Sequence, residues 1–366
     1  MIFEYKRIQP IGILKRKKIA DNIFLKKRNK KATSKEKNSL LYFPNPYICS
    51  RSQKNMKCLV TGGAGFIGSH LVHRLLKEGH HVAVIDDLSF GKTQNLAPHY
   101  GTHPNLSFFR QSITEPLDII FQKEQPEVLF HLAALPRVQF SLQHPQETHE
   151  VNVNGTLHLL IAAKKHGVSR VVFTSSSATY GDQPTRPFKE TMLPNPLSPY
   201  AIHKLIGEQY CTLFAQCYGL ETVSLRYFNV FGPKQDASGD YACLIPKVIQ
   251  AYRQQKPPRI FGDGNQTRDF IYVGDIVEAN MKASQLPSAY CKGNVFNIGS
   301  GKECSVNEIV HTIQQALQSP LEPTHEAAVL EPRNTCADVS YAKTLLNWEP
   351  RYSFETAIQE TLAQAS

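Results

Sequence analysis

Apolar runs alternate with amphipathic segments between residue 56 and about residue 230. The apolar runs predict strands at residues 57–61, 81–85, 106–110, 128–132, 170–175 and 222–230. Apolar residues at helical spacing predict helices at residues 66–78, 147–166 and 199–218. Strands that alternate with helices are typical of a parallel sheet covered by helices on both faces. We therefore predict an α/β fold with a Rossmann-type, doubly wound parallel sheet.

The pattern becomes less regular after residue 231, where proline and glycine interrupt it. Shorter helical patches follow at residues 241–254, 274–286 and 305–317. These features predict a smaller α+β substrate-binding domain over the carboxyl ends of the strands, where open α/β sheets bind ligands. We expect the cofactor-binding domain at residues 56–230, with a later return near 270–298, and the substrate-binding domain mainly at 231–366.

The positive charge of the chain is concentrated in its first 55 residues. They hold 15 Lys and Arg but only three Asp and Glu. The other residues hold 26 Lys and Arg and 28 Asp and Glu, and the formal net charge of the whole chain is +10. A near-neutral body argues against nucleic acid as a partner. We expect residues 1–55 to be a disordered tail, or sequence upstream of a start at Met56. A nucleic-acid or membrane-surface arm and a targeting segment are the alternatives.

The cysteines and the hydropathy pattern indicate the compartment in which we expect the protein. None of the eight cysteines has C-x-x-C spacing, so neither a metal site nor a disulfide framework is indicated. Scattered single cysteines fit a reducing compartment, and we expect a cytoplasmic protein. No run of about 18 apolar residues occurs, so we expect no membrane span.

A glycine cluster directly follows the first predicted strand and opens the first helix. Its sequence, TGGAGFIG, satisfies G-x-G-x-x-G at Gly63, Gly65 and Gly68. It also satisfies G-x-x-G-x-x-G when Gly62 is the first glycine. Glycines allow a tight turn and let a pyrophosphate approach bare backbone at the helix N-terminus. Asp86 ends the second strand, 18 residues after Gly68, and its carboxylate would bind the adenosine ribose but repel a 2′-phosphate, which favours NAD over NADP.

A tyrosine and a lysine lie four residues apart at the start of the helix predicted at residues 199–218. Ser198 is a good N-cap and Pro199 a good first helical residue, so Tyr200 and Lys204 share one helical face. The unperturbed pKa of tyrosine is about 10. The neighbouring ammonium is expected to lower the pKa of Tyr200, and the positive nicotinamide ring of NAD would act in the same direction.

Three serines, Ser175, Ser176 and Ser177, end the fifth predicted strand on the side where ligands bind. A hydroxyl there can bond the substrate oxygen that Tyr200 contacts and relay its proton. Y-x-x-x-K alone is common by chance, and the serine makes this pair more significant.

From about residue 56 to residue 354 the chain resembles the extended short-chain dehydrogenases/reductases, the NAD-dependent epimerase/dehydratase group, and most closely the UDP-glucose and UDP-N-acetylglucosamine 4-epimerases. The matching segments are TGGAGFIGSH, VIDDLSFGKTQNL, HLAALPRV, NVNGT, SSSATYGD, SPYAIHK, LRYFNVFGP, GDGNQTRDFIYVGD and NIGSG. They cover roughly four-fifths of the chain and leave out the basic tail.

The resemblance implies a site residue by residue. For the pyrophosphate and adenosine ribose of NAD it implies Gly62, Gly65, Phe66, Ile67, Gly68, Asp86, Asp87, Ser89, Gly91 and Lys92. The other implied cofactor residues are Ser112, Ile113, Ala133, Ala134, Leu135, Asn152, Ser175, Tyr200, Lys204 and Phe228. The implied catalytic residues are Ser176, Tyr200 and Lys204, and the implied substrate residues are Arg137, Ser176, Ser177, Asn229, Arg268, Arg333 and Thr335.

The activity that the resemblance implies is 4-epimerisation of a nucleotide sugar, with a UDP-sugar as the expected partner. Tyr200 would remove the proton of the carbon 4 hydroxyl while hydride passes to NAD, and hydride would return to the other face of the 4-keto sugar. Family members form a homodimer through a four-helix interface, which here would use residues 147–166 and the Tyr200 helix. The alternatives are a nucleotide-sugar dehydratase, decarboxylase or reductase, or a non-catalytic NAD-binding regulatory protein.

The chain departs from the family pattern at several positions. Ser177, Ala178 and Thr179 follow Ser176, so the acidic residues typical of dehydratases and decarboxylases are missing there, which favours epimerisation. An Asp-Ile pair near adenine is replaced by Ser112-Ile113.

The other departures concern the substrate. Arg137 replaces a serine, and it would meet a substrate phosphate or carboxylate or be a surface charge. Ala328 and Glu331 replace the ends of an R-x-G-D segment that holds the diphosphate, and Arg333 could substitute for the lost arginine. Thr335 occupies a gate position where a small side chain admits a 2-acetamido group, so UDP-N-acetylglucosamine is a candidate substrate.

Overall fold

The computed structural model describes residues 55–237, 243–328 and 334–364. The prediction for the basic tail, which concerns residues 1–55, therefore lies almost entirely outside the described part of the chain. Among the described helices, none is both long and apolar enough to cross a membrane.

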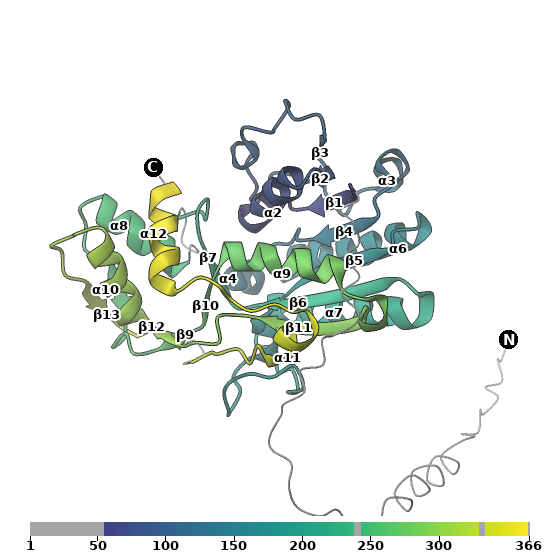
Figure 1. Cartoon of the computed structure of the whole chain (residues 1–366). Coiled ribbons are helices and arrows are strands. Elements are labelled where there is room, and N and C mark those ends of the chain that lie inside the picture. The colour runs from purple at the N-terminus through teal and green to yellow at the C-terminus, as the bar shows by residue number, and fades with distance from the viewer. Residues whose placement is uncertain (1–54, 238–242, 329–333, 365–366) are drawn as a thin grey trace, which may run out of the picture. The chain divides into compact units, whose positions relative to one another are not determined.

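Seven parallel strands form the central sheet, in the order β11-β6-β5-β4-β1-β2-β3 (Figure 1). The strands are β1 (Lys57–Thr61), β2 (His81–Ile85), β3 (Leu106–Phe109), β4 (Val128–His131), β5 (Arg170–Ser176), β6 (Glu221–Tyr227) and β11 (Lys292–Ile298). The chain builds outward from β1 to β3 and then returns to β4 on the other side of β1. The predicted doubly wound sheet is confirmed, and ligands bind at such a reversal of strand order.

Helices cover both faces of the sheet. One face carries α2 (Phe66–Lys77), α9 (Val273–Gln285) and α11 (Ser340–Leu345), and the other carries α3 (Asp118–Glu124), α6 (Thr156–Lys165) and α7 (Pro199–Tyr218). Successive strand residues point to opposite faces, so Val60 enters the core beneath α2 and α9 whereas Leu59 enters the core beneath α3, α6 and α7. This two-sided burial explains why the strands are almost continuously apolar.

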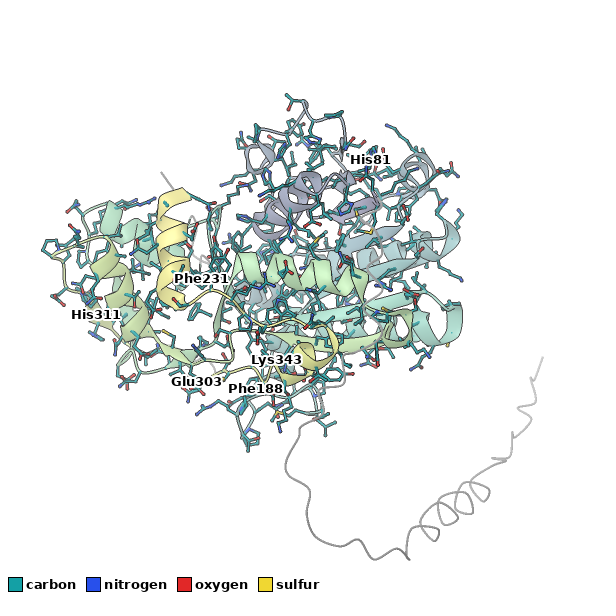
Figure 2. All side chains as sticks on the ribbon, in the orientation of Figure 1. His81, Phe188, Phe231, Glu303, His311 and Lys343 are labelled. Atoms are coloured by element: carbon teal, nitrogen blue, oxygen red, sulfur yellow. The ribbon has the colours of Figure 1, made fainter. Side chains whose placement is uncertain are left out.

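A second core surrounds Phe231, which Figure 2 labels. Its elements are β7 (Asn229–Phe231), α8 (Leu244–Arg253), β8 (Arg259–Phe261), β9 (Thr267–Arg268), β10 (Phe270–Tyr272), β12 (Cys304–Ser305), α10 (Val306–Ala316), β13 (Thr324–Glu326) and α12 (Phe354–Gln364). The strands pair as β7 with β10, β9 with β12, and β8 with β13. Figure 1 shows α8, α10 and α12 grouped together, away from the helices that flank the sheet.

The helix predicted at residues 147–166 is present but contains a π-helical turn. The structure has α4 (Val138–Gln143), α5 (Pro145–His149), a π-helical turn η2 (Glu150–Gly155), and then α6. The amide of Asn152, inside the π turn, bonds the backbone of Leu135 twice: Oδ1 accepts from its N–H at 2.8 Å and Nδ2 donates to its C=O at 3.1 Å. A widened turn of this kind is frequent at functional sites, and this one holds a residue of the predicted cofactor wall.

The run predicted as one strand at residues 222–230 also divides in two. The backbone N–H of Phe228 still donates to Ile298 of the large sheet, but that of Asn229 donates to Asp269 instead. The chain therefore leaves the large sheet after Tyr227 and pairs as β7 with β10. The remaining short helical turns are η1 (Thr93–Leu96), η3 (Ser177–Tyr180) and η4 (Ser288–Tyr290).

Trp348 anchors the C-terminal segment to the sheet, and its replacement should destabilise the fold. The side chain is 2% exposed and Nε1 donates to the carbonyl oxygen of Asp275 at 3.0 Å. Trp348→Phe removes buried volume and leaves that carbonyl unpaired, so we expect a loss of about 2–3 kcal/mol in the free energy of unfolding. Urea unfolding followed by circular dichroism measures it, because the chain has one tryptophan and its fluorescence is lost.

The matched control is Leu193→Ala, because Leu193 is 87% exposed. This change should alter the free energy of unfolding by less than about 0.5 kcal/mol. Equal effects of the two substitutions would contradict an anchoring role for Trp348.

Candidate active site

Glycines form the turn between β1 and α2, at positions where a side chain would not fit. Gly62 has a φ of +69°, and a Cβ there would lie 2.7 Å from the backbone nitrogen of Ala133. A Cβ at Gly68 would overlap the carbonyl oxygen of Gly62. Gly65 is the N-cap of α2, and no side chain among the described residues caps this helix end. Bare backbone and unpaired N–H groups at a helix N-terminus are the chemistry that binds a pyrophosphate.

Asp86 is held beside this turn at the end of β2. Its Oδ2 accepts from the N–H of Ala64 and its Oδ1 from the N–H of Leu88, both at 2.9 Å. Burial raises the pKa of Asp86, and the N–H donors of Leu88 and Ala64 oppose that rise. A Cβ at Gly91 would lie 2.6 Å from Oδ1, so the loop that follows β2 approaches the carboxylate with bare backbone.

The loop after β2 brings together the other residues predicted around the adenosine. The Asp87 carboxylate accepts from the N–H of Ser89 at 2.9 Å, and the N–H of Lys92 donates to the carbonyl oxygen of Ala64 at 3.0 Å. Ser112 and Ile113, the predicted pair after β3, are less open to a ligand. Ile113 is 3% exposed and packs in the core, and the hydroxyl of Ser112 is hydrogen-bonded to that of Thr114.

Residues 133–135 form the opposite wall of the glycine turn. The N–H of Ala133 donates to Thr61 Oγ1 at 3.2 Å. His131, at the end of β4, is buried between the hydroxyls of Thr61 and Thr156 at 2.8 and 2.9 Å, and burial lowers its pKa to about 3. A neutral His131 thus joins β1, β4 and α6. The glycine turn, the fixed Asp86 carboxylate and this wall fit the pyrophosphate and ribose of NAD.

Tyr200 and Lys204 lie on the face of α7 that packs against β5. Ser198 caps the helix through its side chain, as predicted. The hydroxyl of Tyr200 is hydrogen-bonded to the side chain of Ser176. Lys204 Nζ donates to the carbonyl oxygen of Thr174 at 2.8 Å and lies 5.8 Å from the centre of the Tyr200 ring. The structure therefore brings the three predicted catalytic side chains together at the end of β5.

The expected lowering of the pKa of Tyr200 is not found in this structure. Burial raises the pKa of Tyr200 to about 12, and the hydrogen bond with Ser176 only partly opposes it. Burial also lowers the pKa of Lys204 to about 8, against the charge of Glu208. Both groups have lost water at the same place, so desolvation outweighs the attraction between phenolate and ammonium that the sequence suggested.

Ser175, a predicted cofactor residue, uses its hydroxyl within the protein. Its Oγ donates to Glu208 Oε1 at 2.5 Å, and the residue is 1% exposed. Glu208 also receives Arg226 Nε and Nη2 at 2.8 and 2.7 Å. Neither Glu208 nor Arg226 belongs to the predicted site. Only the i, i+4, i+8 spacing of Tyr200, Lys204 and Glu208 could have pointed to the glutamate.

Part of the predicted substrate side converges around Thr267. Its carbonyl oxygen accepts from Arg268 Nη1 at 2.9 Å and from the N–H of Thr335 at 3.2 Å. The hydroxyl of Thr335 is buried and has no hydrogen-bond partner among the described residues. The predictions for Arg333 and Glu331 lie outside the described residues.

The other predicted substrate residues come from three more elements. Asn229 begins β7 and Ser177 begins η3, directly after the end of β5. Arg137 precedes α4, and its guanidinium lies 5.3 Å from the centre of the Phe90 ring. Phe228, predicted at the cofactor, is 3% exposed and packs against the rings of Tyr180 and Phe188.

A cleft of about 750 Å³ is lined by a different set of residues, although Cys336 among them directly follows Thr335 and Glu303 among them bonds the hydroxyl of Thr267. Arg186, Glu303, Cys336 and Lys343 are among the residues that line it, and Figure 2 labels Glu303 and Lys343. None of the predicted site residues lines this cleft, so it is not the candidate active site. In the described part of the chain, no three His, Cys, Asp or Glu side chains are grouped to hold a metal ion.

The fold and the site define a Rossmann-type protein with an NAD cradle beside a Ser-Tyr-Lys group. The sequence model of the NAD dependent epimerase/dehydratase family matches residues 58–299. The chain belongs to this family, whose cofactor is NAD.

Named relatives narrow the chemistry to nucleotide sugars. The chain is 38% identical over 311 residues to a UDP-glucose 4-epimerase of Mycolicibacterium smegmatis, covering 84% of this chain and 97% of that protein. It is 36% identical over 319 residues to a UDP-N-acetyl-alpha-D-glucosaminuronate decarboxylase of Bacillus cytotoxicus, covering 84% and 96%. A solved UDP-N-acetylglucosamine 4-epimerase of Methanobrevibacter ruminantium, in complex with UDP-N-acetylmuramic acid, is 37% identical with a TM-score of 0.81, covering 85% and 98%.

Gly91→Ala tests the cradle, because the new Cβ would displace the Asp86 carboxylate. We expect the dissociation constant of NAD to rise about tenfold or more, the equivalent of losing one charged hydrogen bond. Calorimetric titration of NAD into cofactor-depleted protein measures it. Gly101→Ala is the control: unlike Gly91, Gly101 has nothing within 4 Å of a new Cβ, but its φ of +73° makes any side chain strained. The control should lower stability and leave NAD affinity unchanged, and the reverse result would contradict the assignment of Asp86.

Proposed function

We propose that the protein is a UDP-sugar 4-epimerase that accepts UDP-N-acetylglucosamine. The observation that carries the proposal is the grouping of Tyr200, Ser176 and Lys204 at the end of β5, where Lys204 Nζ donates to Thr174 and lies 5.8 Å from the centre of the Tyr200 ring. A hydroxyl pair at the end of a parallel strand, beside an NAD cradle, suits proton transfer at a carbon that also exchanges hydride. The similarity to named UDP-sugar epimerases supports the same assignment.

Each member of the catalytic group has a distinct role in this proposal. NAD, when bound, accepts hydride from carbon 4 of the sugar and returns it. Tyr200 takes the proton of the carbon 4 hydroxyl and later gives it back, and Ser176 orients that hydroxyl. Lys204 binds the nicotinamide ribose and provides the positive charge that favours the ionised tyrosine. Asp86 and the glycine turn keep the cofactor bound from one turnover to the next.

The composition of η3 favours epimerisation over elimination or decarboxylation. The residues after Ser176 are Ser177, Ala178 and Thr179, none of which is acidic. Expulsion of a hydroxyl group needs a proton donor close to the sugar. Decarboxylation is the principal alternative reaction, because one of the relatives is named a decarboxylase.

Thr335 supports an N-acetylated sugar as the substrate. Its side chain is small, and its buried hydroxyl is unpaired among the described residues. Both features suit an acetamido group at carbon 2, which needs room and offers a carbonyl oxygen and an N–H. A polar ligand group would satisfy a hydroxyl that otherwise stays unpaired.

We also propose that α6 and α7 form the interface of a homodimer. Ile161 of α6 is 50% exposed, and Ile202 and Leu213 of α7 are 39% and 44% exposed. Apolar side chains on two neighbouring helices are a surface that a second copy could bury. Light scattering that gave the mass of one chain would contradict this part of the proposal.

NMR of the purified protein with UDP-N-acetylglucosamine, UDP-glucose and UDP-glucuronate in turn, with no NAD added, tests the function. We expect the galacto-configured product from UDP-N-acetylglucosamine. Tyr200→Phe should lower turnover by about 10³-fold or more, because the base is removed, while bound NAD stays at the wild-type level. Full activity of Tyr200→Phe would contradict the mechanism, and a lack of product from all three substrates with added NAD would contradict the function.

Thr335→Tyr tests the substrate preference. The larger ring should exclude the acetamido group, so we expect kcat/KM for UDP-N-acetylglucosamine to fall about 100-fold relative to that for UDP-glucose. Thr335→Ser, which keeps the hydroxyl and stays small, is the control and should retain the preference. An unchanged ratio in Thr335→Tyr would show that this position does not contact carbon 2.

A further inference from the structure

Helix α7 and the end of β5 are joined by three successive contacts. Tyr200 bonds the side chain of Ser176, and Lys204 Nζ bonds the carbonyl oxygen of Thr174. The third contact is the bond from Ser175 Oγ to Glu208 Oε1. One face of the helix, at positions i, i+4 and i+8, therefore holds three consecutive residues of the strand.

The third contact is supported by a buried ion pair. Glu208 and Arg226 are 1% and 3% exposed, and they form a two-point ion pair at 2.8 and 2.7 Å. Paired, buried and hydrogen-bonded charges hold a fixed geometry, because every alternative leaves a charge without a partner. Arg226 lies on β6, which is the neighbour of β5 in the sheet. Glu208 thereby connects α7 to both strands at once.

Ser175 transmits this geometry to the catalytic group. It is the residue between Thr174, which receives Lys204, and Ser176, which meets Tyr200. Its own hydroxyl donates to Glu208 on α7. A shift of Ser175 would move both neighbours, since they share its peptide bonds.

Glu208 also acts on Lys204 through its charge. Burial lowers the pKa of Lys204 to about 8, and the charge of Glu208 on the same helix opposes that effect. Cys211 is also coupled to Lys204, but burial raises the pKa of its thiol to about 12, so it is uncharged near pH 8. His131 from β4 and His203 from α7 are the other titratable groups coupled to Lys204, and burial lowers the pKa of each, so both are neutral near pH 8. Glu208 is thus the carboxylate that favours the ammonium form of Lys204.

We propose that Glu208 is a positioning residue for the catalytic group: through Ser175 it holds Ser176 against Tyr200 and keeps the end of β5 in place beneath Lys204. The inference rests on the proposed roles of Tyr200 and Lys204. Glu208 itself touches neither substrate nor cofactor, because its carboxylate is occupied by Ser175 and Arg226.

The chain contains a matched control pair at the other end of the same strands. Arg170, at the start of β5, pairs with Glu221, at the start of β6, with Nη2 to Oε2 at 2.5 Å, and Arg170 is 7% exposed. Each pair consists of a buried arginine and a glutamate. Arg170 and Glu221 connect β5 to β6, whereas Arg226 and Glu208 connect β6 to α7. Only the Glu208 pair lies beside Tyr200 and Lys204.

The experiment compares Glu208→Gln/Arg226→Gln with Arg170→Gln/Glu221→Gln and the wild type, each as purified protein with retained NAD. We expect the Glu208 variant to lose about tenfold in kcat with KM within about threefold, as a misaligned catalytic group does. The alkaline limb of its kcat should move to lower pH by about one unit, because the ammonium of Lys204 is lost as pH rises through a pKa that Glu208 no longer raises.

The control variant should lose stability but keep kcat and the alkaline limb of the wild type. Equal pH profiles and equal kcat in the two variants would overturn the inference. If the Glu208 variant does not fold, Ser175→Ala decides the question, since it removes one hydrogen bond and no charge. A fall of about threefold in kcat with unchanged retention of NAD supports the inference, and wild-type kcat overturns it.

A wild type that converts no UDP-sugar contradicts the proposed function instead. The inference is then read from NAD retention as pH rises, measured by absorbance after gel filtration. The Glu208 variant should release NAD at lower pH than the control variant, because Lys204 binds the nicotinamide ribose in its charged form. Identical retention curves would overturn the inference.

Discussion

The packing of α7 against the end of β5 is the constraint on which the site depends. Three contacts along one helical face fix the helix to three consecutive strand residues, from Tyr200 at its start to Glu208 two turns later. β5 is itself fixed between β4 and β6. The side chains proposed as catalytic thus lie at the end of a strand that is paired on both sides, which limits their motion to the small distances that proton transfer tolerates.

The proposed NAD site, in contrast, depends on residues that have no side chain. Gly62, Gly68 and Gly91 each bring backbone to within van der Waals distance of another backbone or of the Asp86 carboxylate. The cradle surrounds β1 and β2, and the catalytic group lies at the end of β5, two strands away across β4. A dinucleotide that spans the carboxyl ends of these strands connects the two, which is why a doubly wound sheet suits hydride chemistry on a bound sugar.

Burial sets the electrostatics of the site. It raises the pKa of Tyr200 and lowers that of Lys204, so it shifts both groups towards their neutral forms in the protein alone. A buried carboxylate four residues beyond Lys204 works against this tendency for the lysine. Burial favours the neutral phenol of Tyr200. The positive charge that would stabilise its ionised form must then come from the groups around it when ligands are bound.

The sequence by itself determined the sheet, the glycine turn and the Tyr200–Lys204 pair, because periodicity, turn chemistry and helical spacing are local properties that neighbouring residues specify. Local signals also predicted the start of α7 at Pro199 and the end of β2 at Ile85. Only the tertiary structure decided that η2 interrupts the helix before α6, that Ser175 turns to Glu208, and that Tyr200 has a raised pKa. Each of these depends on residues far away in the chain, and on the loss of water that their packing causes.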